Sequence, residues 1–250
     1  MILNGFINFI YHVGNITLFF FNTLLSILKK PPKLKYIFKN MEDIGVNAAL
    51  LIILTGFFTG GVLVVETYPT FHKFNAEFLI GALVSLSLTR ELSPVLVALL
   101  VTARSGSAIA ANIGTMRITE QIDALEVMAV NPLGYLVAPR IIAALIMVPA
   151  LTVLSIIAGI IGGYVVGVYL YHINPYLFWQ KMVTLTELKD IYGGLFKASV
   201  FGVILVLIAS YFGYHAKGGA EGVGRATTTA VVVASVTILI LDYFLTALIY

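Results

Sequence analysis

The chain has 250 residues, of which 60% are hydrophobic and only 11% are charged, and its formal net charge is +3. Soluble domains carry about 25% charged residues, so this composition predicts a polytopic membrane protein and leaves no room for a soluble catalytic domain. The absence of cysteine excludes disulfides, thiolate metal sites and cysteine nucleophiles. The histidines are dispersed without metal-ligand spacing, so no cofactor or metal is expected, and nothing supports nucleic-acid binding.

The first segment, Met1–Leu28, contains no charged residue and is long enough to span a bilayer. Its polar residues nevertheless follow helical spacings and form one stripe: Asn4, Asn8, His12, Asn15, Asn22 and Ser26. A polar stripe beside an aromatic-rich face favours an interfacial or re-entrant helix, and a full span remains the alternative.

Five further segments are predicted to cross the membrane, because each contains enough apolar residues to span a hydrocarbon core of about 30 Å. They are Ile44–Val65, Phe78–Ala111, Ile141–Leu170, Ile191–Tyr214 and Ala226–Tyr250. The second is longer than the core requires, so its end is expected to project into the cytoplasm. The fold class is therefore all-α, with a single membrane domain over residues 1–250. A short helix is also possible on the outer surface within His172–Asp190.

Positive charge sets the orientation of these spans. Ten lysines and arginines fall on one side: Lys29, Lys30, Lys33, Lys35, Lys39, Arg104, Arg117, Arg140, Lys217 and Arg225. Only three fall on the other side: Lys73, Lys181 and Lys189. The larger group marks the cytoplasmic side, so the N-terminus lies on or in the cytoplasmic leaflet and the C-terminus lies outside.

The adjacent charges Arg90 and Glu91 interrupt a long apolar run. A charge at this depth costs about 2.5–3.5 kcal/mol on insertion scales, so both side chains should face the bundle interior or a watery cavity. One interpretation is a salt bridge that braces neighbouring helices. The other, which we favour, is a polar lining that meets a charged headgroup, since an arginine guanidinium binds phosphate in a bidentate manner.

Thr115–Val130, between the second and third spans, contains an amphipathic helical pattern. One row is apolar, with Ile118, Ile122, Leu125 and Ala129, and the neighbouring row is acidic, with Glu120, Asp123 and Glu126. The pattern fits a loop helix that packs under its own bundle. It also fits a coupling helix that docks into a groove of a cytosolic partner, and we favour the second interpretation.

Three smaller features have structural interpretations. The tandem GxxxG of Gly159, Gly163 and Gly167 permits close helix approach, and we favour packing within the chain over a dimer contact. The glycine-rich run Gly213–Thr229 has no GxxxxGK[ST] pattern, so it predicts a tight turn and not a nucleotide site. Lys197, near the outer end of its span, is expected to snorkel outward or to pair with Asp242.

Several stretches resemble the MlaE family of ABC-transporter permeases over about residues 40–250. They are RELSPVLVALLVTARSGSAIAANIGTMRITEQIDALEVMAVNP, PRIIAALIMVPALTVLSIIAGIIGG and GVGRATTTAVVVAS. The N-terminal segment is similar to the family's interfacial elbow helix only in character.

The resemblance implies a homodimer in a bacterial inner membrane that moves glycerophospholipid and maintains the lipid asymmetry of the outer membrane. It implies a lipid cavity between the subunits, with Arg90 and Glu91 in its wall, lined by the first, second and fifth spans. It also implies a cytosolic MlaF-like ATPase that binds Glu120, Asp123, Leu125 and Glu126. A periplasmic MlaD-like MCE protein and a MlaB-like STAS protein, which binds the ATPase, are the other expected partners. ATP hydrolysis is expected in the partner, so the chain itself is not expected to be an enzyme.

Two other function classes fit the residues alone. An ATP-independent channel or secondary transporter would need an ion site at membrane depth, for which the only candidates are Arg90, Glu91 and Asp242, and no inverted repeat is apparent. A structural scaffold would need no polar cavity lining at all.

Overall fold

The computed structural model describes residues 2–29 and 31–250, with side chains from Gly14 onward. These residues are helical apart from short connections, and none is in a strand, which confirms the all-α prediction. The α-helices are α1 (Ile2–Lys29), α2 (Leu34–Met41), α3 (Asn47–Lys73), α4 (Ile80–Ser87), α5 (Ser93–Val101), α6 (Ser107–Ile118), α7 (Gln121–Val127), α8 (Ala138–Tyr164), α9 (Pro175–Leu185), α10 (Leu188–Tyr214) and α11 (Gly219–Ile249). Short π-helical or 3₁₀ segments join several of them: η1 (Glu42–Val46), η2 (Glu77–Leu79), η3 (Leu88–Leu92), η4 (Thr102–Gly106), η5 (Leu133–Val137) and η6 (Val165–Leu170).

Five helical units of the described chain are long and apolar enough to cross a membrane, as predicted. They are Leu34–Lys73, Glu77–Ile118, Leu133–Leu170, Leu188–Tyr214 and Gly219–Ile249. Most are longer than the apolar segments of the sequence, because the helices continue past the last apolar turn into their polar ends. In the first and second units π-helical segments join successive α-helices, whereas in the third a single helix, α8, has a π-helical segment at each end.

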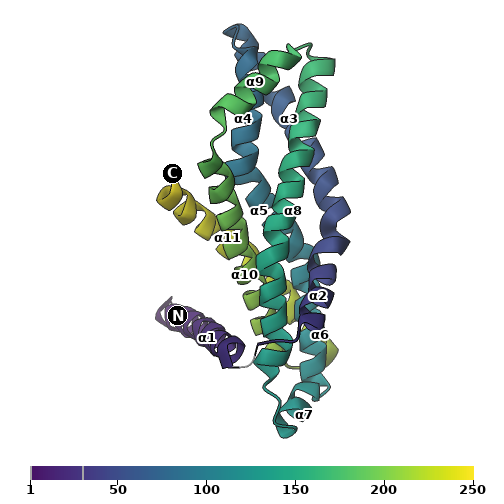
Figure 1. The fold of residues 1–250 in the computed structure, drawn as a ribbon. Helices are drawn as coiled ribbons and strands as arrows, with labels where there is room; N and C mark the ends of the chain where they lie inside the picture. Colours follow the sequence, from purple (N-terminus) through teal and green to yellow (C-terminus); the bar gives the residue numbers. More distant parts are fainter. Residues whose placement is uncertain (1, 30) are drawn as a thin grey trace.

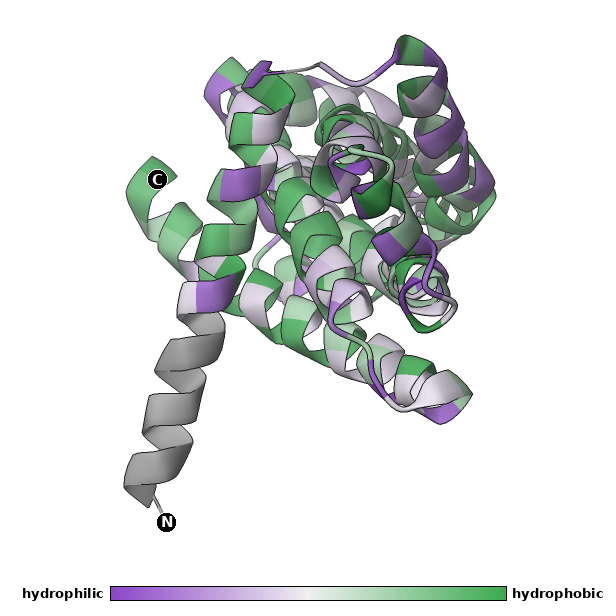
Figure 2. Ribbon diagram, turned by 90° about the horizontal axis from the view of Figure 1, so that it is seen from below, coloured by the Kyte–Doolittle hydropathy of each residue, from purple (hydrophilic) through white to green (hydrophobic). Residues whose placement is uncertain are grey.

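The long helices form an upright bundle with a short helix at each end (Figure 1). Helix α9 lies across one end, where an outer surface helix was expected, and Asn174 begins it by accepting hydrogen bonds from the N–H groups of Tyr176 and Leu177. Helix α7 lies at the other end, and α11 crosses the bundle obliquely. Seen along the bundle, the helices carry mostly apolar residues (Figure 2).

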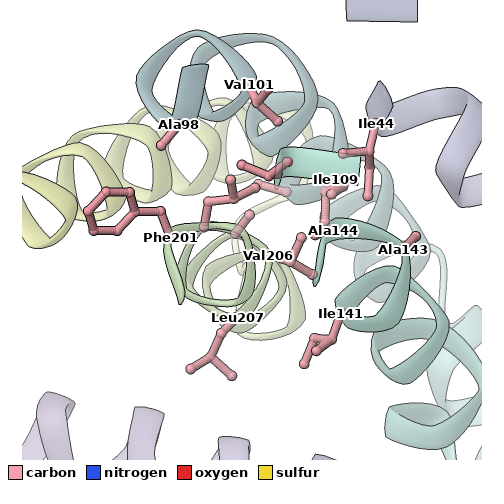
Figure 3. Packing of buried hydrophobic residues seen from close by; sticks show 14 of the residues in the cluster. Ile44, Ala98, Val101, Ile109, Ile141, Ala143, Ala144, Phe201, Val206 and Leu207 are labelled. Carbon is pink, nitrogen blue, oxygen red and sulfur yellow. The ribbon is translucent and has the colours of Figure 1, made fainter. Parts of the chain in front are cut away.

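Helix α10 supplies much of the core that holds the bundle together, since it contacts α5, α6, α8 and α11. Phe201 and Leu205 of α10 are fully buried, and they belong to one cluster with Ile44, Ala144 and Val101 from three other units. Figure 3 shows Phe201, Ala144, Val101 and Ile44 among the buried side chains around α10. Burying each large apolar side chain contributes about 1.5–3 kcal/mol, so this cluster fixes α10 as the frame for the site described below.

Glycines allow α3 and α8 to approach closely. A Cβ atom at Gly60 would collide with the backbone of Gly159, and one at Gly163 would press on Val84 and the carbonyl of Gly60. Gly159 and Gly163 therefore pack against the chain's own α3, and Gly167 packs against Phe178 of α9, so the motif serves packing within the chain as favoured above. At the opposite end, Gly218 and Gly219 adopt φ values of +91° and +67° and make the tight turn predicted before the last span.

Helix α1 does not run parallel to the bundle but lies beside it at a steep angle (Figure 1). Its Phe19 is buried, with ring centroids 5.7 Å from Tyr211 and 5.8 Å from Tyr214. The side chains of Asn4, Asn8 and His12, which define part of the polar stripe, lie outside the described residues. Whether α1 is interfacial or spanning therefore remains a prediction.

Candidate functional site

The turn that carries Arg90 and Glu91 is a π-helix, η3, and Pro94 follows it by two residues. In a regular α-helix the N–H of residue 94 would bond the carbonyl of residue 90, but proline has no N–H. The carbonyl oxygen of Arg90 instead accepts a hydrogen bond of 3.0 Å from Nζ of Lys197 on α10. Isolated π-turns of this kind are frequent at functional sites.

Lys197 is the centre of the site, and its side chain is completely buried. Its Nζ lies 2.7 Å from Oε2 of Glu91 and 3.0 Å from Oδ1 of Asp242, and it also donates to Oγ1 of Thr246 at 2.6 Å. The predicted pairing of Lys197 with Asp242 is thus confirmed. The alternative prediction, that Lys197 snorkels to the surface, is wrong, because two carboxylates and a free carbonyl are available inside the bundle.

Arg90 points the other way and pairs with Asp190 at the start of α10. Its Nε donates to Oδ1 of Asp190 at 2.8 Å, while Oδ2 of Asp190 accepts from the N–H of Glu187 at 2.9 Å. Asp190 therefore closes the first turn of α10 and neutralises Arg90 at the same time. The Arg90 guanidinium also lies 4.8 Å from the ring centre of Tyr250, whose hydroxyl donates to the carbonyl of Asp190.

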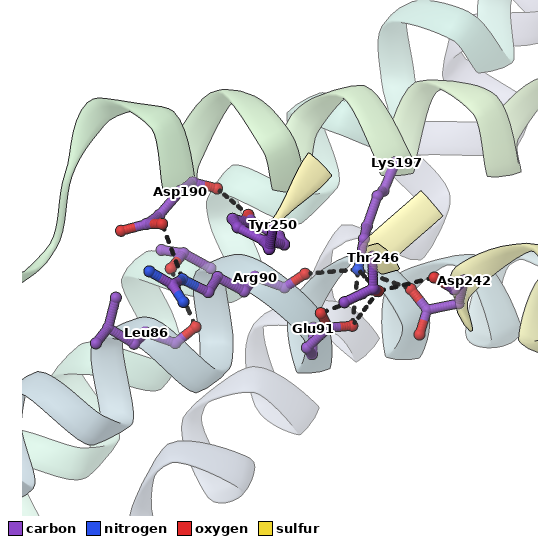
Figure 4. A network of polar contacts seen from close by, with 9 residues as sticks. Leu86, Arg90, Glu91, Asp190, Lys197, Asp242, Thr246 and Tyr250 are labelled. Carbon is purple, nitrogen blue, oxygen red and sulfur yellow. Dashed lines mark hydrogen bonds and ion pairs between the residues drawn. The ribbon is translucent and has the colours of Figure 1, made fainter. Parts of the chain in front are cut away.

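Together these contacts form one network across η3, α10 and α11 (Figure 4). It contains two cations and three carboxylates, so its formal charge is one negative unit, which one further cation or one proton would neutralise. The side chains of Arg90 and Glu91 remain 40% and 37% exposed, whereas Lys197 and Asp190 are buried. The network is thus anchored inside the bundle and open on the face formed by Arg90 and Glu91.

Both interpretations of the Arg90–Glu91 pair find support in this geometry. Each residue braces another helix by an ion pair, as the first interpretation expected. Each also keeps an exposed fraction that a ligand can reach. Asp190, Thr246 and Tyr250 were not predicted from the sequence as members of the site. For Asp190 the signal was available, since an acidic residue at the third position of a helix is a capping pattern.

The second candidate site is α7 and the turn before it. The amphipathic segment Thr115–Val130 is not one helix, because α6 continues to Ile118 and the backbone then turns through Glu120 at φ +59°. Helix α7 itself covers only Gln121–Val127. Ile122 is fully buried and Leu125 packs against the core, so the apolar row faces the chain's own bundle.

The acidic row of α7 is partly engaged within the chain. Asp123 accepts from Nη1 of Arg117 at 2.6 Å, and Glu126 accepts from the hydroxyl of Tyr214 at 3.0 Å. Glu120 is exposed. The residues that stand out are Val127 and Met128, whose exposed fractions are 88% and 63%. Their apolar side chains project at the end of the molecule, and the sequence analysis did not single them out as a contact surface.

Comparisons with known proteins agree with this arrangement. Residues 37–248 match the family model for the permease MlaE. A probable ABC transporter permease protein of Rickettsia typhi is 44% identical over 244 residues, covering 98% of this chain and 94% of that protein. The intermembrane phospholipid transport system permease protein MlaE of Haemophilus influenzae is 40% identical, with 98% of each chain covered. The chloroplastic protein TRIGALACTOSYLDIACYLGLYCEROL 1 of Arabidopsis thaliana is 33% identical over 90% of this chain and 64% of its own length.

The five-span helical fold and these similarities define an ABC transporter permease, a multi-pass membrane protein. Within that class, the chain belongs to the MlaE permease family.

Proposed function

We propose that this protein is the membrane subunit of a phospholipid transporter, which moves glycerophospholipids between a bacterial inner membrane and a periplasmic MCE protein and so maintains outer-membrane lipid asymmetry. A separate cytosolic ATPase supplies the energy. The observation that carries this proposal is the charge network that is anchored on buried Lys197 and keeps Arg90 and Glu91 partly exposed at membrane depth. The relative from Haemophilus influenzae, named for intermembrane phospholipid transport, supports the choice of substrate.

The chemistry of the exposed face suits a phospholipid headgroup. The guanidinium of Arg90 binds Asp190 through Nε and is 40% exposed, so part of its N–H donors can meet a phosphate. The excess carboxylate charge of Glu91 and Asp242 suits a cationic headgroup or a proton. Because the surroundings are apolar, an uncharged ligand that leaves these charged groups without a partner is disfavoured more strongly than it would be in water.

Helix α11 supports a homodimer with a shared cavity. One of its faces joins the charge network through Asp242 and Thr246. The exposed apolar side chains on the rest of the helix include Val232, Val236, Leu239, Ile240, Tyr243, Phe244 and Leu248. A second copy of the chain that packs near this helix would enclose the exposed side of the network. The cavity would then lie between the two subunits, with Arg90 and Glu91 in its wall.

Helix α7 is the proposed docking point for an MlaF-like ATPase. Glu120 and Glu126 lie on its exposed surface, Asp123 is half exposed, and the projecting Val127 and Met128 add an apolar tip. Leu125 supports this surface from below by packing against the core. An acidic rim around an apolar tip fits a partner groove with an apolar floor and basic edges. If Glu120→Lys with Asp123→Lys left ATPase association and transport intact, this assignment would be wrong.

The distribution of basic residues supports the proposed orientation. The α2 lysines lie near the end of the bundle that carries α7, and Lys181 lies on α9 at the opposite end (Figure 1). By the positive-inside rule the α7 end is cytoplasmic, so the C-terminus is periplasmic. The α9 end would then meet the MlaD-like MCE protein. A MlaB-like STAS protein would join through the ATPase.

The test is transport of a fluorescent phospholipid by the permease reconstituted with its ATPase and MCE partner. We expect ATP-dependent transfer that falls at least tenfold in Arg90→Lys and Glu91→Gln, since each loses a contact of about 1.5–3 kcal/mol. The exposed Lys73→Gln is the matched control. Transfer that needs no ATPase would instead favour a channel or secondary transporter. Normal transfer in both variants would favour a scaffold.

A further inference from the structure

A cavity of about 480 Å³ lies at the α7 end of the molecule, away from the charge network. It is enclosed by the end of α1, the linker to α2, α2 itself and the segment that follows α7. The residues that line it are Ser26, Lys29, Pro31, Pro32, Lys33, Tyr36, Ala129, Val130, Asn131, Gly134 and Tyr135. None of them belongs to the network around Lys197.

Specific contacts build the walls of this cavity. The side-chain amide of Asn131 donates to Oγ of Ser26 at 3.1 Å, and the hydroxyl of Tyr135 donates to that of Tyr36 at 3.4 Å. Gly134 allows α1 to approach, because a Cβ atom there would collide with Oγ of Ser26. Residues more than 90 positions apart are thus joined around one hollow.

The lining is cationic and contains no acidic side chain. Lys29 and Lys33 are both exposed and placed on neighbouring parts of the wall, with the hydroxyl of Tyr36, which accepts from Tyr135, as a further hydrogen-bond donor. Two ammonium groups and a donor hydroxyl without a competing carboxylate favour an anion, and a phosphate above all.

Exposed apolar residues lie close to the two lysines in the sequence. Leu28 precedes Lys29, and Leu34 and Phe38 follow Lys33 on α2, with exposed fractions of 74%, 69% and 65%. Large exposed aliphatic and aromatic side chains next to a basic cluster are typical of a surface at the boundary between headgroups and acyl chains. The ligand that satisfies both parts is an amphiphile with an anionic head.

We propose that this cavity binds the headgroup of an anionic phospholipid from the leaflet on the α7 side, as a resident lipid distinct from the transported cargo. Lys29 and Lys33 contact the phosphate, and the acyl chains lie along Leu34 and Phe38. The bound lipid joins the end of α1 to the segment after α7. Its presence therefore steadies the docking helix, and the site makes the transporter sensitive to the surface charge of its membrane.

The test measures the lipid retained by the full-length permease after reconstitution into vesicles of phosphatidylcholine with or without phosphatidylglycerol, followed by purification and native mass spectrometry. We expect retained phosphatidylglycerol in the wild type and about thirtyfold weaker retention in Lys29→Gln with Lys33→Gln, which corresponds to about 1 kcal/mol for each lysine. The control is Lys35→Gln with Lys39→Gln, which removes the same charge from exposed positions on α2 outside the cavity.

Three results would overturn the proposal. Equal loss in the control variant would show diffuse attraction to the membrane surface and no site. Full displacement of phosphatidylglycerol by inorganic phosphate would show a site for a free anion. Unchanged lipid retention with weakened ATPase association in Lys29→Gln with Lys33→Gln would show a surface for a protein partner. None of these readouts depends on transport, so the cargo assignment and the resident-lipid site can fail separately.

Discussion

The most informative single change is the replacement of Lys197 by methionine, which keeps the length of the side chain but removes its charge. Lys197 is fully buried and contacts four oxygen atoms, two of which belong to carboxylates. Removing one partner of a buried ion pair costs about 3–5 kcal/mol. We expect a loss of about 3 kcal/mol in the free energy of unfolding, at the lower end, because Glu91 is 37% exposed and retains some hydration.

The assay follows unfolding in mixed micelles by the fluorescence of Trp179, the only tryptophan in the chain, which lies on α9. A loss of about 3 kcal/mol lowers the ratio of folded to unfolded protein more than a hundredfold. The control is Lys73→Met, which removes an exposed lysine and should change the stability by less than about 0.5 kcal/mol.

A compensated variant separates charge imbalance from lost packing. In the triple variant Glu91→Gln, Lys197→Met and Asp242→Asn, no unpaired charge is left inside the bundle, so most of the stability should return. The reasoning is refuted if Lys197→Met is as stable as the wild type. It is also refuted if the triple variant is no more stable than the single one.

Three further predictions follow from named contacts. Tyr250→Phe removes the hydrogen bond to the carbonyl of Asp190 and should lower the free energy of unfolding by about 1 kcal/mol in the same assay. An unchanged free energy of unfolding would show that this bond does not stabilise the fold. Val127→Asp should leave the fold intact, since Val127 is 88% exposed, but should abolish copurification with the ATPase; equal loss in Thr184→Asp on α9 would contradict a specific α7 surface. Gly60→Leu should lower the free energy of unfolding by about 3 kcal/mol, because the new side chain overpacks against α8. Gly224→Leu, where the space is open, should be tolerated. Equal losses in the two variants would argue against close packing as the cause.

Hydropathy was sufficient to predict five spans, because the energetic penalty for exposing polar backbone and charge in a membrane leaves few alternatives. The GxxxG spacing was likewise enough to predict close helix packing, since only glycine lets the backbones of α3 and α8 touch. The pair of Lys197 and Asp242 could be predicted because both were expected near the same end of neighbouring spans.

The remaining parts of the network depend on how far each helix is rotated about its own axis, which hydropathy does not determine. The π-turn of η3 changes that rotation locally. Adjacent residues on a helix point in different directions, so Arg90 reaches Asp190 and Glu91 reaches Lys197. Similarly, periodicity predicted one helix over Thr115–Val130, but the positive φ of Glu120 splits it. The split places Val127, and not the acidic row alone, at the exposed tip.

Helix α11 is attached to the rest of the chain in two chemically different ways. Near its beginning, Val223 packs against Gly114, and Ala230 and Ala234 are buried. Near its end, Asp242 and Thr246 add hydrogen bonds and an ion pair to the apolar contacts of Ile238, Leu241 and Leu245. Close apolar packing cannot be replaced one contact at a time, whereas each polar contact can be exchanged for one with water, a phosphate or an ammonium group. The first half of α11 is therefore held by close packing, and the second half has in addition polar contacts that the headgroup of the proposed lipid cargo can replace.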